Sequence, residues 1–274
     1  MGYTVFANYQ LHLLRKQILR SFSNGYAYYA SDIRTHKNPY GNASWRTRLT
    51  CWGYTGAEGP DNWGLLSPDY ETCAIGRMQS PIDITGAFPV NGPALKFDYK
   101  PSSLKILNSG HTLQVNYAPG STLTAAGEIY ELLQFHFHVP SEHAFDGSHA
   151  AMEAHFVHKN LAGVLAVVGV MMEVGTQNHA LAAVFGNVPT EAGIEVDVAG
   201  TTVDASAILP TATTGYFHYK GSLTTPPCSE GVHWFIFPDA IEVSAEQVAN
   251  FERMFGHNAR PLQKRNDRLL IVSS

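Results

Sequence analysis

Short runs of β-branched and aromatic residues recur along the chain from Cys51 onward, separated by clusters of glycine, proline, asparagine and aspartate. Most runs alternate apolar and polar residues or are continuously apolar over strand-like lengths, as a large sheet requires. Clear examples are residues 103–107, 112–117, 129–139, 151–158 and 164–174. Helical signal is sparse and is best at residues 244–255, where Ser244 stands as the N-cap. The pattern predicts a mainly β fold.

Size, composition and charge narrow the class of protein further. The chain has 274 residues, of which 45% are hydrophobic and 15% charged, and all-β domains of more than about 200 residues are common. A formal net charge of −5 gives no electrostatic reason to expect nucleic acid as a partner. The longest apolar run, residues 163–172, is shorter than the roughly 18 residues of a membrane helix. We expect a soluble protein without a membrane span.

Residues 1–50 lack the strand-like pattern of the rest of the chain. Residues 11–20 have the pattern of a short basic amphipathic helix, and turn-rich loop follows. The segment lacks the continuous apolar core and cleavage site of a secretory signal peptide. We predict an N-terminal extension over residues 1–50 and a single domain over residues 51–274. The extension is open to three interpretations: a poorly ordered tail, a remnant of processing or of a mis-assigned start, or a docking arm.

The densest chemistry lies in residues 132–139 (LLQFHFHV). Residues two apart on a strand share a face, so Gln134, His136 and His138 point one way and the two phenylalanines between them point the other way. Two imidazoles next to each other on one strand face make a natural site for a metal ion. The phenylalanines suit a hydrophobic core behind that site.

A second run, residues 152–158 (MEAHFVH), places Glu153 and His155 on one strand face in the same manner. A lone histidine on a strand is more often an ordinary core or surface residue than a ligand. Three histidines on two strands, with Gln134 and Glu153 placed to accept their second ring protons, favour a metal site. Three neutral imidazoles leave zinc its full charge and an open fourth position, which is the pattern of a catalytic centre.

The cysteines do not form a metal site of their own. Cys51, Cys73 and Cys228 are far apart in the sequence and form no CxxC motif, which argues against a structural zinc knuckle. An odd count permits one disulfide and one spare thiol. Three reduced thiols in a cytosolic protein are also compatible with the sequence alone.

Seven segments together give the chain a family resemblance. From about Cys51 to the C-terminus it resembles the alpha-class carbonic anhydrases, with the matching motifs in the family's order. They are WGY at 52–54, QSPIDI at 79–84, NSGH at 108–111, QFHFH at 134–138, SEH at 141–143, EAHFVH at 153–158 and GSLTTPPC at 221–228. The resemblance implies one domain with a large, mostly antiparallel, twisted ten-stranded sheet and short peripheral helices. It also implies a zinc enzyme that hydrates carbon dioxide reversibly to bicarbonate and a proton through zinc-bound hydroxide.

The resemblance assigns roles to individual residues. It makes His136, His138 and His155 the zinc ligands, and Thr224, with Glu142 as the acceptor of its hydroxyl proton, the residue that orients the hydroxide. Residues implied to support the ligands are Gln134, Glu153 and Asn258, with Arg260 beside them. Residues implied to contact carbon dioxide or bicarbonate are Val157, Val167, Leu223, Thr225 and Trp234.

His111 matches the position of the family's proton shuttle, since an imidazole with a pKa near 6.5 suits transfer near neutral pH. The motif NSGH reads equally well as a simple turn with an exposed histidine. Tyr54 and Gln114 match positions that support the water chain. Gln114 and Ser109 stand where many relatives carry asparagine, which bears on the speed of proton transfer.

Further expectations concern the compartment and the ligands. Relatives with cysteines at these positions imply a Cys73–Cys228 disulfide with Cys51 free, and hence an oxidising compartment, periplasmic or extracellular. Expected small-molecule ligands are carbon dioxide, bicarbonate, sulfonamides and small anions, and a homodimer is compatible with the family.

Rival interpretations are a zinc-dependent esterase or other hydrolase on the same fold, a non-catalytic carbonic-anhydrase-like binding module, and a cupin-like metal protein.

Overall fold

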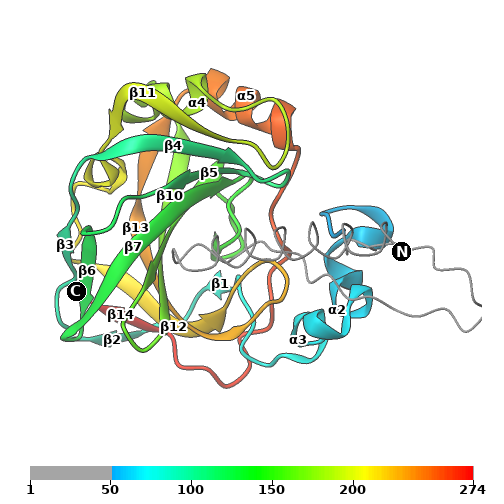
Figure 1. Cartoon of the computed structure of the whole chain (residues 1–274). Helices are drawn as coiled ribbons and strands as arrows, with labels where there is room; N and C mark the ends of the chain where they lie inside the picture. The colour runs from blue at the N-terminus through cyan, green and yellow to red at the C-terminus, as the bar shows by residue number, and fades with distance from the viewer. Residues whose placement is uncertain (1–50, 274) are drawn as a thin grey trace, which may run out of the picture. The chain divides into compact units, whose positions relative to one another are not determined.

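A twelve-stranded sheet organises the part of the chain that the computed structural model describes, residues 51–273 (Figure 1). The predicted extension, with its helix at residues 11–20, lies outside the described residues. Ten strands follow one another across the sheet: β11 (Glu195–Val203), β4 (Ser102–Asn108), β5 (Leu113–Asn116), β7 (Glu128–His138), β9 (Met152–Lys159), β10 (Leu165–Val174), β13 (Glu230–Val243), β12 (Tyr216–Ser222), β14 (Ile271–Ser273) and β2 (Phe88–Val90). Strands β3 (Lys96–Asp98) and β6 (Thr122–Ala125) pair off this path, and β1 (Asp83–Ile84) pairs with β8 (Ala144–Phe145) separately.

The predicted fold class, a mostly antiparallel twisted sheet, is confirmed, although the sheet has twelve strands where ten were expected. The sheet is mixed, because β10 pairs parallel with β13 and β14 pairs parallel with β2. Between β10 and β13 the chain forms α4 (Ala182–Gly186), β11 and β12, and a connection of that length can return a strand in the parallel direction. A pattern of single strands does not reveal such a pairing, since it depends on where the connecting segments lie.

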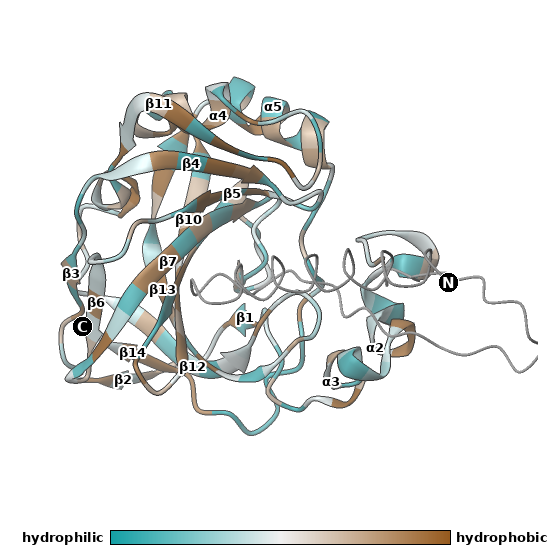
Figure 2. Ribbon diagram, viewed as in Figure 1, coloured by the Kyte–Doolittle hydropathy of each residue, from teal (hydrophilic) through white to brown (hydrophobic). Residues whose placement is uncertain are grey.

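The central strands carry two different buried faces. On one face, which we call the core face, phenylalanine and aliphatic side chains from β7, β9, β10 and β13 join the largest hydrophobic cluster of the described residues. The members of this cluster on the four central strands include Phe135, Phe137, Ala154, Phe156, Val168, Val170, Phe235 and Phe237. The opposite face, the site face, carries Gln134, His136, His138, Glu153, His155 and Val157. Figure 2 shows the resulting alternation of hydrophobic and hydrophilic segments along β7.

Short helices cover the periphery of the sheet. They are α2 (Trp63–Leu66), α3 (Thr72–Ile75), α4 and α5 (Ala245–Phe255), with 3₁₀ turns at Gly56–Glu58, Pro60–Asn62, Pro68–Tyr70, His179–Leu181 and Ala205–Ile208. The predicted cap is confirmed: the Ser244 hydroxyl accepts from the backbone N–H of Gln247, whose side chain accepts from the backbone N–H of Ser244. In Figure 1, α4 and α5 lie beside β11. No helix within residues 51–273 is long and apolar enough to cross a membrane.

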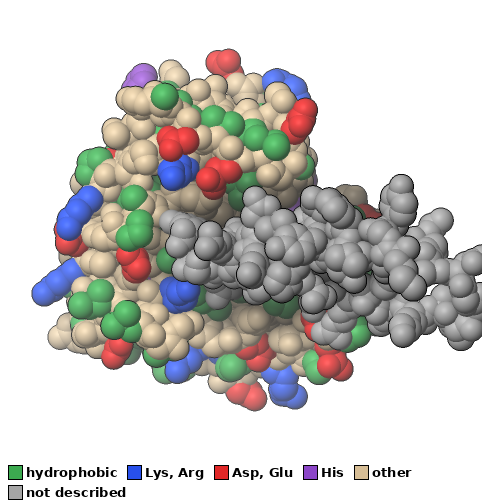
Figure 3. Space-filling view, in the orientation of Figure 1, with side chains coloured by type: hydrophobic (Ala, Val, Ile, Leu, Met, Phe, Trp, Pro, Cys, Tyr) green, Lys and Arg blue, Asp and Glu red, His purple; other side chains and the backbone are tan. Residues whose placement is uncertain are grey.

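A disulfide braces the segment that leads out of the sheet after β12. Cys73 and Cys228 are bonded across a separation of 155 residues, as the resemblance implied, and Cys51 is exposed and not bonded. In the chain-entropy model, closing a loop of this length stabilises the fold by about 5 kcal/mol. The bridge packs with Trp52 and Trp63 in a small cluster of its own. Elsewhere on the surface, acidic and basic side chains are interspersed (Figure 3).

Candidate metal centre and catalytic site

The three predicted ligand histidines come together at the centre of the sheet. His136 lies directly opposite His155 in the antiparallel pairing of β7 with β9, and His138 lies two residues along β7 on the same face. One ring nitrogen from each of the three lies within 4.8 Å of the others. His138 and His155 are each only 1% exposed, while His136 is half-buried. Close spacing of three imidazoles, with one partly open to solvent, is the arrangement of a metal centre with an accessible side.

Polar contacts on the outer side of each ring, hydrogen bonds for His136 and His138 and an ion pair for His155, leave one nitrogen of each ring free. His136 Nδ1 lies 2.9 Å from Gln134 Oε1, His138 Nδ1 lies 2.8 Å from the backbone oxygen of Asn258, and His155 Nε2 lies 2.9 Å from Glu153 Oε1. The nitrogens that remain are Nε2 of His136, Nε2 of His138 and Nδ1 of His155. His138 Nε2 is fully buried and has no hydrogen-bond partner among the described residues. An orphaned buried nitrogen at the centre of three is the expected consequence of a site built to bind a metal ion, and three neutral nitrogens suit zinc.

The pKa is lowered in two of the three candidate ligand histidines and raised in the third. Burial lowers the pKa of His136 well below its ordinary value, and the neighbouring imidazoles lower it further. Burial also lowers the pKa of His138, although Glu142 opposes the shift. For His155, Glu153 and Glu142 outweigh burial and raise the pKa. For Glu153, His143 and His155 outweigh burial and hold the pKa well below its ordinary range, so Glu153 is an anionic acceptor.

Glu153 is fixed by four contacts in the buried interior. Its Oε2 accepts from the backbone N–H groups of Glu142 and His143, both at 2.8 Å, and its Oε1 lies 2.8 Å from His143 Nδ1 besides the contact with His155. Gly169 faces this carboxylate from β10, and a Cβ there would lie 2.8 Å from Glu153 Oε1. The absence of a side chain at Gly169 therefore makes room for the close approach of Glu153.

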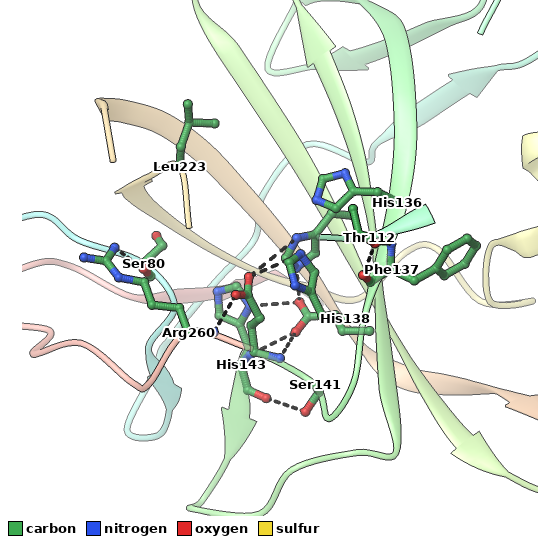
Figure 4. Close-up of polar contacts among 12 residues, drawn as sticks. Ser80, Thr112, His136, Phe137, His138, Ser141, His143, Leu223 and Arg260 are labelled. Carbon is green, nitrogen blue, oxygen red and sulfur yellow. Dashed lines mark hydrogen bonds and ion pairs between the residues drawn. The ribbon is translucent and has the colours of Figure 1, made fainter. Parts of the chain in front are cut away.

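Figure 4 shows the polar contacts around His138, His143 and Arg260. Glu142 has one oxygen committed and one available. Its Oε1 accepts from the backbone N–H of Arg260 at 2.8 Å. Its Oε2 is buried, lies 3.5 Å from His138 Nε2, and has no hydrogen-bond partner among the described residues. The hydrogen bond from the Thr224 hydroxyl to Glu142 is therefore not formed in this structure. Thr224 itself is 5% exposed, directly after Leu223 on the segment that follows β12.

The predicted apolar wall lies beside His155. Val167 of β10 stands between Val157 of β9 and Trp234 of β13 in adjacent cross-strand pairs, and all three belong to one buried cluster against which Leu223 packs. The Trp234 ring lies edge-on to the His155 ring, with centroids 4.8 Å apart. Of the bicarbonate-contacting candidates, Thr225 is half-buried and its backbone oxygen accepts from Cys228 N.

The candidate shuttle lies in the turn between β4 and β5. The His111 ring stacks on Trp52 with centroids 3.7 Å apart, and the Tyr54 ring lies edge-on to it at 6.3 Å. Asn258 connects this turn to the ligand strand, because its side-chain N–H groups donate to the backbone oxygens of His111 and Phe137. Gln114 is the direct cross-strand neighbour of His136. Burial lowers the pKa of His111.

A second layer of polar residues surrounds the site, and of its members the sequence analysis gave a supporting role only to Arg260. His143 Nε2 lies 2.7 Å from the Tyr219 hydroxyl, which in turn lies 2.8 Å from Ser80 Oγ. The guanidinium of Arg260 donates to Gln79 Oε1 and to the backbone oxygens of Ser80 and Cys73. Tyr219 and Arg260 lie outside the seven motifs, whereas Gln79 and Ser80 lie in QSPIDI and His143 lies in SEH. For these last three, their position in those motifs was the available signal, but the pairing of residues from distant segments was not visible in the sequence.

Known proteins are similar to this chain in sequence and in fold. Residues 58–274 match the family model of eukaryotic-type carbonic anhydrases. A carbonic anhydrase of Nostoc sp. is 45% identical over 231 residues, covering 82% of this chain and 87% of that protein. The alpha-carbonic anhydrase of Thermovibrio ammonificans, solved with the inhibitor sulfanilamide, is 40% identical with a TM-score of 0.78, covering 81% of this chain and 98% of that one. A carbonic anhydrase from Chlamydomonas reinhardtii, solved with acetazolamide, is 38% identical with a TM-score of 0.73, covering 82% of this chain and all of that one. The chain therefore belongs to the alpha-class, eukaryotic-type carbonic anhydrase family of enzymes.

Proposed function

We propose that this enzyme hydrates carbon dioxide reversibly to bicarbonate and a proton with a zinc ion held by His136, His138 and His155. The observation that carries the proposal is the convergence of three imidazole nitrogens within 4.8 Å, each left free because the other ring nitrogen already has a partner. Zinc bound by three neutral imidazoles supplies the acidity that lowers the pKa of a bound water to about 7, a magnitude whose known example is carbonic anhydrase itself. The lowered pKa values of His136 and His138 favour the neutral imidazoles that such a site requires.

Glu142 and Thr224 would orient the nucleophile. A carboxylate only accepts hydrogen bonds, and one oxygen of Glu142 already accepts from Arg260 N. The other oxygen has no partner among the described residues and would accept the hydroxyl proton of Thr224, and the Thr224 oxygen would then act as an acceptor toward the site. A hydroxide that donates its hydrogen to the Thr224 oxygen would have its lone pair directed at the apolar wall of Val157, Val167 and Trp234. A small linear apolar substrate fits beside this wall.

His111 would carry the proton to solvent. Its lowered pKa keeps the ring neutral near pH 7, so that it can accept a proton and pass it on. Tyr54 and Gln114 flank the route, Tyr54 against the His111 ring and Gln114 opposite His136. We extend the proposal to an oxidising compartment, periplasmic or extracellular, on the basis of the disulfide. Sulfonamides and small anions are the inhibitors expected at such a site, as the sulfanilamide and acetazolamide complexes of the relatives suggest.

Two substitutions separate proton transfer from attack on carbon dioxide. Stopped-flow hydration of His111→Ala should show a lower kcat with kcat/KM nearly unchanged, and small imidazole buffers should restore much of the lost kcat. Thr224→Ala should lower kcat/KM, with no rescue by imidazole, because it misorients the nucleophile. If His111→Ala lowers both parameters equally and ignores imidazole, the shuttle assignment is wrong. If the zinc-loaded wild-type protein does not hydrate carbon dioxide at all, the proposed function is wrong.

A further inference from the structure

Three polar side chains form a line from the edge of the sheet to the metal centre. The Glu195 carboxylate, on edge strand β11, accepts a hydrogen bond from Asn116 Nδ2. Asn116 Oδ1 accepts from Gln114 Nε2 at 2.6 Å. Gln114 and Asn116 lie directly opposite His136 and Gln134 in the pairing of β5 with β7, so both side chains share the site face with the ligands. In the region of β4 and β11 seen in Figure 1, charged side chains gather at the surface in Figure 3.

The two amides alone do not determine which way they point. Each amide has a donor end and an acceptor end, so a pair joined N–H to O is equally satisfied when both are flipped. Glu195 removes this symmetry because a carboxylate can only accept. Asn116 must turn its Nδ2 toward Glu195, its Oδ1 must then face Gln114, and Gln114 must donate from Nε2. The Gln114 amide then has its carbonyl oxygen, Oε1, without a donor and its second Nε2 hydrogen without an acceptor among residues 51–273.

We propose that Glu195, acting through Asn116, is a specificity-determining residue that makes Gln114 present an acceptor rather than a donor beside His136. The negative end of the amide dipole then faces the site, which disfavours small anions and favours water and neutral ligands. In the hydration direction the substrate is neutral while the product bicarbonate and the expected small-anion inhibitors are negatively charged, so this polarity reduces competition by anions at the metal. Only this last consequence rests on the proposed function, while the orientation of Gln114 does not.

Inverting the charge at position 195 should reverse the orientation of both side-chain amides, Asn116 and Gln114. In Glu195→Lys the ammonium can only donate, so Asn116 turns its oxygen outward and Gln114 turns its Nε2 into the site. Thiocyanate, the probe anion, should then bind roughly two- to tenfold more tightly than to a charge-matched control, the range expected for one net hydrogen bond. The control is Glu191→Lys, in the exposed loop before β11, where the wild-type side chain has no hydrogen bond or ion pair with another described residue. Glu195→Lys combined with Asn116→Leu should behave like the control, since the line is then broken.

Nuclear magnetic resonance of the full chain reads the orientation directly. In the wild-type protein the Gln114 side-chain NH₂ protons should show nuclear Overhauser effects to Asn116, and in Glu195→Lys to the His136 ring. Unchanged effects in Glu195→Lys overturn the proposal whatever the thiocyanate affinity does. A flipped amide with an affinity equal to that of Glu191→Lys overturns the role in specificity. Failure of the wild-type protein to bind thiocyanate argues against the proposed function and leaves the resonance experiment to decide the orientation.

Discussion

Strands β7 and β9 present two buried faces of opposite character. On the core face, Phe135, Phe137 and Phe156 pack as aromatic neighbours, with ring centroids of Phe135 and Phe156 5.4 Å apart. On the site face, each buried polar group is positioned by specific polar contacts. Glu153 alone makes four such contacts, with Glu142, His143 and His155. The first kind of face depends on volume, because apolar contacts are not directional. The second depends on the identity of each partner, because a buried polar group that loses its partner costs about 1–3 kcal/mol.

Removing one ligand from the site face should have the largest effect on activity. His136→Ala should abolish stoichiometric zinc binding and reduce carbon dioxide hydration to the uncatalysed background, because two imidazoles remain where three converge. Metal analysis and stopped-flow hydration check both outcomes. Gln134→Ala is the matched variant, since it keeps the ligand and removes only its partner, and it should weaken zinc binding about 10- to 100-fold. Full zinc retention in His136→Ala would remove His136 from the ligand set.

The core face should respond in stability rather than in metal binding. Phe156 is fully buried, and Phe156→Ala should lower the free energy of unfolding by about 3–5 kcal/mol through lost burial and the cavity left behind. Zinc stoichiometry should remain one per folded chain, since the side chain points away from the ligands. Urea unfolding, with metal analysis of the folded fraction, measures both. Loss of zinc from a folded Phe156→Ala protein would show that the two faces are not independent.

His158 is the polar exception on the core face and should make stability depend on pH. Its Nε2 lies 2.6 Å from the Tyr99 hydroxyl and its Nδ1 lies 3.2 Å from the backbone oxygen of Ala166. Burial lowers the pKa of His158 to about 4, against 6.5 in the unfolded chain. As pH falls below 6.5, His158 becomes protonated in the unfolded chain, whereas in the folded chain it stays neutral until about pH 4. The free energy of unfolding therefore falls between pH 6.5 and pH 4. Between pH 7 and pH 5 this contribution is about 2 kcal/mol.

The comparison that isolates this effect is His158→Gln, whose amide can replace both hydrogen bonds without titrating. The decline in unfolding free energy from pH 7 to pH 5 should be shallower by about 2 kcal/mol in the variant than in the wild-type protein. Equal slopes for the two proteins would mean that His158 titrates normally in the folded state.

Local sequence pattern predicted what depends on a single strand or a single helix end. The alternation in residues 129–139 predicted β7 and its two faces, and the same rule placed Gln134 beside His136. Pairing between distant segments was not predictable in this way. The parallel contact of β10 with β13, and the contact of Tyr219 with both His143 and Ser80, join residues far apart in the chain, and no local periodicity encodes them. The hydrogen bond from Thr224 to Glu142 came from the resemblance alone, and this structure does not form it.

The smallest effect expected is at the cap of α5, which packs against the core face through Phe251. The Phe251 ring lies 6.2 Å from that of Phe137, so fraying of the helix reaches the core face before it reaches any ligand. Ser244→Ala removes the hydroxyl that accepts from Gln247 N and should lower the free energy of unfolding by about 1 kcal/mol. Zinc binding and hydration should be unchanged. Ser244→Asp preserves the cap and should restore stability. If Ser244→Ala lowers zinc affinity while stability holds, the helix supports the site face directly, and Asn258, which follows α5 and contacts His138, is the residue through which it does so.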